Sequence, residues 1–193
     1  MADPVSILLV GCGRMGTGHL QALSALPELG QVVAGVDPSA AARENLRQAF
    51  GIERSYADLD AALAAEEALA VWVCSPNNLH AEYALVALEA GRHAFVEKPL
   101  ALNLADVDRM IAAAEGRERL LMSGQSLRFM PHIRYVKTLV DQGAVGKVRH
   151  VVHRRMSPGR GGDEQSWFAR QALSGGILPG IGTHSLDAIL WWL

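Results

Sequence analysis

The sequence predicts an α/β protein that begins with a doubly wound parallel sheet of the Rossmann type. From Ser6 to about Gly124, short β-branched runs alternate with alanine- and leucine-rich amphipathic stretches, which is the pattern of repeated βαβ units. The runs are almost continuously apolar, as expected for parallel strands that helices cover on both faces. A glycine-rich turn follows the first run directly and opens the first helix.

Five runs are expected to form strands, and the stretches between them are expected to form helices. The runs are SILLV at 6–10, QVVAGV at 31–36, LAVWVC at 69–74, HAFVE at 93–97 and RLLMSG at 119–124. The clearest helix follows the third run, where apolar side chains recur at helical spacing and Gly91 provides a stop. Its apolar stripe contains Leu79, Tyr83, Val86, Ala87 and Ala90.

Residues 126–193 differ in composition and are expected to form a second domain, after a first domain at residues 1–125. They predict a helix that ends near Gly143, an extended strand at 147–156, and a long Gly- and Ser-rich loop at 157–176 that is either functional or mobile. A final helix with one apolar face follows. That face contains Leu186, Ile189, Leu190 and Leu193, at positions i, i+3, i+4 and i+7.

The second domain is expected to be incomplete. Its last helix has no stop signal, neither a Gly or Asn after it nor a basic last turn. One strand, one loop and one apolar helix are too few to bury a core, because an independent sheet needs about three strands. We therefore expect the chain to represent a truncated product or a fragment of a longer two-domain protein.

The composition is that of an ordinary globular protein, with half of the residues apolar and a fifth charged. No apolar run approaches the ~18–20 residues of a membrane span, and the N-terminus lacks the basic start of a secretory signal. We therefore expect a cytoplasmic protein with no membrane partner. Cys12 and Cys74 show neither disulfide nor metal-ligand spacing, so we expect packing residues and no metal site.

The net charge of −2 conceals an uneven distribution. Residues 1–125 carry 9 Lys and Arg against 16 Asp and Glu, whereas residues 126–193 carry 9 against 4. The basic excess forms either a surface that meets an anionic substrate or the acidic first half, or an ordinary solvated surface. Because no aromatic residues are interleaved with the basic ones, the charge does not indicate nucleic-acid binding.

The turn GCGRMG has the spacing GxGxxG between a strand and a helix, the context that a dinucleotide site requires. Gly11 permits the tight turn, Gly13 lets a pyrophosphate approach, and Gly16 lets the helix pack on the strand, with Arg14 and Met15 between them. Asp37 ends the second run, 21 residues after Gly16, and is expected to bind the ribose hydroxyls. Its charge favours NAD over NADP, a preference that Arg43 could soften.

Two further strand ends are expected at the same ligand-binding edge. The third run ends in CSPNNLH, where Ser75, Pro76, Asn77 and His80 are candidate cofactor-binding residues. Asn77 or Asn78 could instead cap the next helix. The fourth run ends in VEKPL, where Lys98 needs a partner because a buried ammonium is costly; Glu97 or a substrate hydroxyl could serve.

In this order, GxGxxG with Asp37, SPNNLH, ALEAGRHAFVEKPLA, LRFMPHI and GTHSLD resemble the Gfo/Idh/MocA oxidoreductases, the family of glucose-fructose oxidoreductase and inositol 2-dehydrogenase. The resemblance covers essentially all 193 residues. It implies a C-terminal α/β domain with an open antiparallel sheet, which usually forms a homo-oligomer interface. By this resemblance the chain would stop shortly after the first helix of that domain.

The resemblance implies an NAD-dependent enzyme that interconverts a secondary alcohol and a ketone on a sugar, cyclitol or other polyol. His184 would accept the proton and Lys98 would hydrogen-bond the reacting oxygen. Glu97 and Lys98 are both counted with the cofactor-binding residues. An imidazole titrates near neutral pH, and a helix N-terminus would keep it uncharged. Two alternatives stay open within the family: a non-catalytic regulator that binds the dinucleotide, and a glycosidase that uses NAD transiently.

One position departs from the family pattern DxGxH: Gly180 stands where the pattern has Asp. This departure places full dehydrogenase activity or the usual polyol substrate in question. Asp187, three residues after His184, could orient the imidazole, contact the substrate or belong to the helix surface. Four arginines could reach an acidic substrate or lie on the surface; they are Arg128, Arg154, Arg155 and Arg160.

Overall fold

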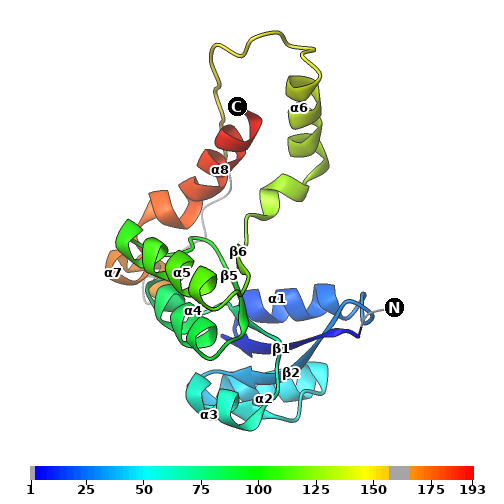
Figure 1. The fold of residues 1–193 in the computed structure, drawn as a ribbon, viewed down its shortest axis with the longest axis vertical. Coiled ribbons are helices and arrows are strands. Elements are labelled where there is room, and N and C mark those ends of the chain that lie inside the picture. Colours follow the sequence, from blue (N-terminus) through cyan, green and yellow to red (C-terminus); the bar gives the residue numbers. More distant parts are fainter. Residues whose placement is uncertain (1–2, 157–165) are drawn as a thin grey trace.

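The computed structural model describes residues 3–156 and 166–193, and its first part is a six-stranded parallel sheet in the order β3-β2-β1-β4-β5-β6 (Figure 1). This is the Rossmann strand order. The strands are β1 Val5–Val10, β2 Gly30–Val36, β3 Ser55–Tyr56, β4 Ala70–Val73, β5 His93–Val96 and β6 Leu121–Ser123. All five expected strands are present; β3, with two residues, is too short to give a pattern.

Helices cover both faces of this sheet, as the apolar runs predict. On one face α1 (Arg14–Leu23) and α2 (Ala40–Phe50) contribute Leu20 and Leu46 to a cluster with β1 and β2. The other face is covered by α3 (Leu59–Ala65), α4 (His80–Glu89) and α5 (Leu104–Gly116), which form the larger core cluster. Gly91, with φ +73°, follows α4 at the expected stop.

The strand register brings several loops to one edge. Val10 at the end of β1 pairs with Val36 and Val73, and Val73 pairs with Val96, which in turn pairs with Ser123. Because all pairs are parallel, the residues that follow these strands meet at the carboxyl edge of the sheet. They are Gly11, Asp37, Cys74, Glu97 and Gly124.

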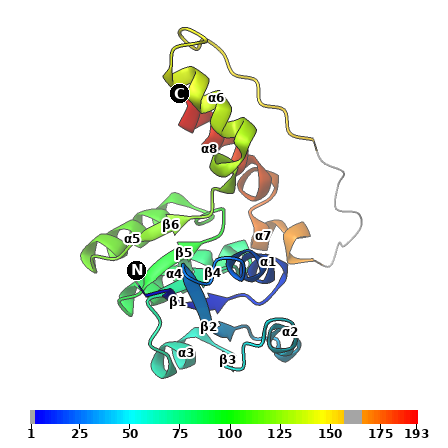
Figure 2. The same cartoon turned by 90° about the vertical axis from the view of Figure 1, so that its right-hand side faces the viewer.

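The second part is built from helices that stand beyond this edge (Figure 2). The longer ones, α6 (Pro131–Asp141) and α8 (Thr183–Trp192), pack through Ile133, Ala188 and Trp192. Short turns and helices connect them to the sheet: η2 (Ser126–Phe129), η3 (Trp167–Ala169), α7 (Gln171–Ser174) and the π-helix η4 (Leu178–Gly182). Of these, α7 contacts η1 (Asn77–Leu79), the short helix between β4 and α4. As expected, α6 ends just before Gly143, which has φ +68°.

One prediction for this part is wrong. Residues 147–156 form no strand, because none of the described residues offers them a neighbouring strand to pair with. The expected apolar face of α8 is largely exposed, with Leu190 75% and Leu193 70% accessible. Instead, Ala188 and Trp192 are buried and the Trp192 indole N–H donates to the Ile133 carbonyl at 3.0 Å. The buried face of α8 is therefore the one that packs against α6.

Within residues 3–156 and 166–193, no helix combines the length and the apolar content needed to cross a membrane.

Candidate functional site

The glycine-rich turn after β1 has the geometry that its spacing predicts. Gly11 has φ +92°, and a Cβ there would lie 2.6 Å from the Cys74 backbone. A Cβ on Gly16 would lie 2.1 Å from the Gly11 carbonyl oxygen. These two glycines are therefore required by close backbone packing, so Gly16 shapes the site from beneath.

Gly13 differs, because a Cβ there would meet no atom within 4 Å. The residue is the N-cap of α1, whose first turn contains no acidic residue and receives no side-chain cap. The open space therefore faces backbone N–H groups at the positive end of a helix, beside Arg14. This arrangement fits an anionic group such as a pyrophosphate.

Asp37 lies beside this turn and is held by the backbone. One carboxylate oxygen accepts the Cys12 N–H at 2.9 Å, and the other accepts the Ser39 N–H at 2.9 Å. Arg43 donates to the Asp37 backbone carbonyl, so its guanidinium lies next to the residue that the sequence predicts to bind the ribose hydroxyls. Burial and the Asp37 charge raise the pKa of the Cys12 thiol to about 12, which leaves it a neutral packing residue.

A cavity of about 480 Å³ opens between this turn and the residues after β4. Seven predicted cofactor residues line it: Gly11, Gly13, Arg14, Met15, Asp37, Ser75 and Pro76. Three residues of the second part close its far side, namely Ser166, Trp167 and Phe168. The sequence indicated a functional loop at 157–176 but gave no signal for which of its side chains reach the cavity.

Two predicted cofactor residues lie beneath the loop and do not line the cavity. His80 is fully buried; its Nδ1 lies 2.6 Å from the Pro99 carbonyl oxygen and its Nε2 3.0 Å from that of Ser75. Burial lowers the pKa of His80 despite these contacts. The Asn77 side chain caps no helix and donates to the Ser174 carbonyl at 2.8 Å, which joins the two parts of the chain. Both residues position the loop.

Glu97 has a partner that the sequence did not indicate. His19, three residues after Gly16 on α1, contacts the Glu97 carboxylate at 2.7 Å, and the rings of Trp72 and Phe95 lie edge-on to the imidazole. The second Glu97 oxygen accepts the Lys98 backbone N–H at 3.1 Å. Burial opposes ionisation, but the His19 hydrogen bond and the nearby charges hold the pKa of Glu97 below its usual value.

The Lys98 ammonium reaches from the sheet to the second part. Its Nζ donates to the Gly180 carbonyl oxygen at 2.7 Å. Gly180 lies inside the π-helix η4, and π-helical turns occur frequently at functional sites. The position that departs from the family pattern thus contacts Lys98 through its backbone.

His184 lies one helical turn after Gly180, within a continuous helical segment formed by η4 and α8. The helix N-terminus expected to keep it neutral is therefore absent, and burial is the main cause instead. Together with the charges of Lys98 and Arg155, burial lowers the pKa of His184 to about 4. Its buried Nδ1 receives no hydrogen bond from the part of the chain that is described.

Asp187 does not orient His184. It forms a two-pronged ion pair with Arg128, with distances of 2.8 and 2.6 Å, and the guanidinium lies 5.7 Å from the centre of the Trp191 ring. Two residues predicted to bind substrate thus bind each other. Arg160 lies outside the described residues.

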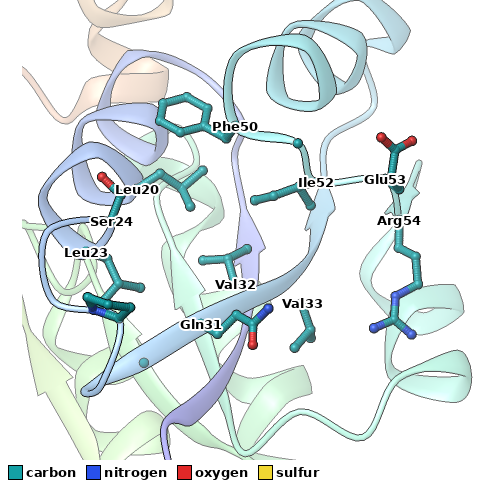
Figure 3. Close-up of a pocket in the computed structure, with 13 residues that line it drawn as sticks. Leu20, Leu23, Ser24, Gln31, Val32, Val33, Phe50, Ile52, Glu53 and Arg54 are labelled. Atoms are coloured by element: carbon teal, nitrogen blue, oxygen red, sulfur yellow. The ribbon is translucent and has the colours of Figure 1, made fainter.

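A larger hollow of about 620 Å³ lies elsewhere, at the amino end of β2. Figure 3 shows Leu20 and Leu23 of α1 on one side and Val32 of β2 beneath, with Phe50 at the end of α2 and Ile52 just after that helix closing the rest. It contains no predicted site residue and faces away from Asp37, at the opposite end of the same strand. Across the described ranges, His, Cys, Asp and Glu form no group of three suited to a metal ion.

Comparisons with known proteins agree with this architecture. Residues 5–125 match the GFO_IDH_MocA model, described as "Oxidoreductase family, NAD-binding Rossmann fold", and residues 133–193 match the GFO/IDH/MocA C-terminal domain. The chain is 34% identical over 181 residues to myo-inositol 2-dehydrogenase of Thermotoga maritima, covering 93% of this chain and 52% of that protein. The chain spans about half the length of the curated relatives it matches.

Two solved structures show the same fold. Myo-inositol 2-dehydrogenase from Lactobacillus plantarum has a TM-score of 0.86 and 27% identity, covering 98% of this chain and 56% of that one. The WlbA dehydrogenase from Bordetella pertussis, solved with NADH and UDP-GlcNAcA, has a TM-score of 0.88 and 27% identity, covering 99% and 56%.

Proposed function

The chain belongs to the Gfo/Idh/MocA oxidoreductase family, and from this membership we propose that it acts as an NAD-dependent oxidoreductase. Its reaction interconverts a secondary alcohol and a ketone on a sugar, cyclitol or related small molecule. One observation carries the proposal: Lys98 and the turn before His184 are in direct contact, at the same sheet edge that holds the dinucleotide-type cavity. This contact supports the assignment of Lys98 and His184 to one site.

The cavity fits two parts of NAD, the pyrophosphate and the ribose. Open space at Gly13 and the uncapped start of α1 suit a pyrophosphate, and Arg14 adds positive charge. Asp37 lines the same cavity and can accept hydrogen bonds from ribose hydroxyls, while its charge disfavours a 2′-phosphate. When bound, NAD accepts or supplies the hydride, which no protein side chain can do.

Lys98 and His184 handle the oxygen and its proton. The Lys98 ammonium exchanges its bond to the Gly180 carbonyl for one to the reacting oxygen and lowers the cost of negative charge there. His184, with a pKa of about 4, is neutral at pH 7 and accepts the hydroxyl proton in the oxidation direction. The loops after β4 and β5 are held in position by four residues, namely His19, Glu97, Asn77 and His80.

The proposal also covers the domain boundary, the partner, the cellular location and the oligomeric state. The boundary between the two domains lies near residue 125, the partner is a small sugar or polyol, and the location is the cytoplasm. A homo-oligomer is proposed for a full-length, two-domain protein of this kind.

A fluorescence titration with NADH and NADPH tests the cofactor, and NADH formation with myo-inositol or levoglucosan tests the chemistry. We expect NADH to bind about tenfold or more tightly than NADPH, and Asp37→Ser to reduce that preference, because the 2′-phosphate is no longer repelled. Asp108→Ser, an exposed change on α5, is the matched control and leaves the preference unchanged.

Lys98→Met separates binding from chemistry. It should abolish turnover while NADH affinity stays the same, because Lys98 does not line the dinucleotide cavity. Unchanged turnover in this variant would refute the role assigned to Lys98. If the unsubstituted chain binds NADH but turns over no polyol, the regulatory alternative is favoured.

A further inference from the structure

We propose that Gln125 binds the substrate, and that its side-chain amide hydrogen-bonds a hydroxyl on the carbon next to the reacting one. This inference rests on the proposed function for the position of the reacting centre. It assigns a specificity-determining residue that the sequence did not indicate. It also narrows the substrate to compounds with a hydroxyl adjacent to the alcohol or ketone that reacts.

Gln125 starts beside Lys98 at the carboxyl edge of the sheet. Val96 of β5 and Ser123 of β6 are paired in register, and Lys98 and Gln125 each follow two residues later. Because neighbouring strands lie about 5 Å apart, the two side chains leave the sheet next to each other. Two polar groups that start at this spacing can converge on oxygens of adjacent carbons in one sugar or cyclitol ring.

Both side chains end on one helical turn, the turn that leads into His184. The Lys98 Nζ donates to the Gly180 carbonyl oxygen at 2.7 Å, and the Gln125 Nε2 donates to the Thr183 Oγ1 at 3.2 Å. Gly180 and Thr183 are three residues apart, and Thr183 directly precedes His184. Direct contacts therefore join Gln125 to the same turn that joins Lys98 and His184.

Hydrogen-bonding capacity is left unused at this place. Within the described ranges, five buried side-chain atoms have no hydrogen-bond partner, and three of them belong to Ser123, Gln125 and His184. On Gln125 the atom is Oε1, which belongs to the same amide whose Nε2 contacts Thr183. Buried polar atoms without a partner are rare, so a ligand group that hydrogen-bonds the amide fits here.

A hydroxyl matches this amide better than a charged group does. The amide oxygen is an acceptor and requires a donor, which neither a carboxylate nor a phosphate dianion offers. An ammonium would donate, but it would lie beside the Lys98 ammonium and be repelled by it. A hydroxyl donates without carrying charge. It also accepts, so it serves equally well if the amide oxygen and nitrogen exchange places.

The contact between Gln125 and Thr183 leaves the amide able to move. At 3.2 Å it lies at the long end of the range for an N–H···O hydrogen bond, and Gln125 is only half-buried. In the proposed reaction Lys98 exchanges the Gly180 carbonyl for the reacting oxygen. Gln125 leaves the same helical turn in the same way, and its amide turns to the neighbouring hydroxyl.

The test is a cycle between one side chain and one ligand hydroxyl, measured on the full chain with and without NADH. The probes are cyclohexanol, cyclohexane-1,2-diol and cyclohexane-1,3-diol, each diol as cis and trans isomers. NMR of the His184 imidazole, assigned from its absence in His184→Gln, reports the affinities. We expect one 1,2-diol isomer to bind about three- to tenfold more tightly than cyclohexanol and the 1,3-diols, as one additional uncharged hydrogen bond allows.

Variants of two glutamines complete the cycle. Gln125→Met should lower the affinity for the 1,2-diol to that for cyclohexanol and leave cyclohexanol binding unchanged, because methionine keeps the shape and removes the amide. Gln125→Glu keeps an acceptor oxygen and should retain most of the preference. The control is Gln142→Met, the same change at an exposed position after α6, which should have no effect.

Four results would overturn the proposal. Equal affinity for all probes would mean that the amide binds water alone, and a parallel loss of cyclohexanol and diol binding in Gln125→Met would mean a purely structural role. The other two are an intact preference in Gln125→Met and the absence of a saturable shift with any probe. Failure of NADH to bind overturns only the proposed function, because the preference is also measured without nucleotide.

Discussion

The sheet part and the helical part of this molecule differ in how completely their apolar side chains are covered. In the sheet part Leu8, Leu9 and Val71 are fully buried between two layers of helices. In the described portion of the helical part only four apolar residues are buried: Leu127, Ile133, Ala188 and Trp192. The first part thus has a core of its own, whereas the second is held by a small cluster and by contacts to the sheet.

This difference in packing determines how firmly each residue of the candidate site is held in position. Lys98 and Asp37 extend from a packed sheet edge, and the helices that carry Gly180 and His184 are positioned by a few polar contacts across the boundary. Asn77 to Ser174 and Lys98 to Gly180 are two of these contacts. A change in the sheet core should therefore affect global stability, and a change near the boundary should affect local order.

The largest effect is expected from Leu46→Ala in the sheet part. Leu46 is fully buried, and its side chain fills the space that Gly35 leaves, since a Cβ on Gly35 would lie 2.2 Å from the Leu46 Cδ2. Truncation should lower the free energy of unfolding by about 3–5 kcal/mol, because it leaves a cavity in a tightly packed layer. Urea denaturation followed by circular dichroism measures it.

Leu104→Ala is the matched control, because Leu104 is 80% exposed at the start of α5. We expect a change within about 0.5 kcal/mol. A similar loss in both variants would mean that the sheet part is not packed as described.

The sheet part could be predicted because its determinants are local. Each parallel strand is an apolar run between helices, and the turn glycines are required by contacts that recur wherever this strand-turn-helix unit occurs, as at Gly11 and Gly16. Only β3 was not predicted, since a strand of two residues shows no periodicity. The helical part could not be predicted in this way, because the partner of each face lies far away in the sequence.

Residues 147–156 illustrate that limit, because their β-branched composition predicts a strand, whereas a strand needs a neighbour. In the site, spacing located the glycines, Asp37 and Lys98. It could not show that Arg128 pairs with Asp187, or that Trp167 reaches the cavity, because these contacts span tens of residues.

An intermediate effect is expected from Arg128→Gln at the boundary. The substitution leaves the Asp187 carboxylate, whose side chain is only 14% exposed, without its guanidinium partner. We expect a loss of roughly 1–3 kcal/mol that is confined to the helical part, between the values for exposed and buried pairs. Hydrogen exchange should show faster exchange in α8 and an unchanged sheet.

Arg134→Gln on α6 serves as the control, because Arg134 is exposed and has no ion-pair partner among the described residues. Equal exchange in the sheet and in α8 after Arg128→Gln would show that the two parts unfold as one unit. The contrast between them would then concern packing alone.

The smallest effect is expected from Leu190→Ala, a substitution on the apolar face of α8 that the structure leaves exposed. The spacing of Leu186, Ile189 and Leu190 gives α8 an apolar face, but Leu190 on that face is 75% exposed, and the buried face is that of Ala188 and Trp192. Alanine also has the highest helix propensity. The free energy of unfolding should therefore change by less than about 0.5 kcal/mol in dilute solution. A loss above about 1.5 kcal/mol that grows with protein concentration would show that another copy of the chain covers this face, and the pattern rather than the exposure would then describe the helix in solution.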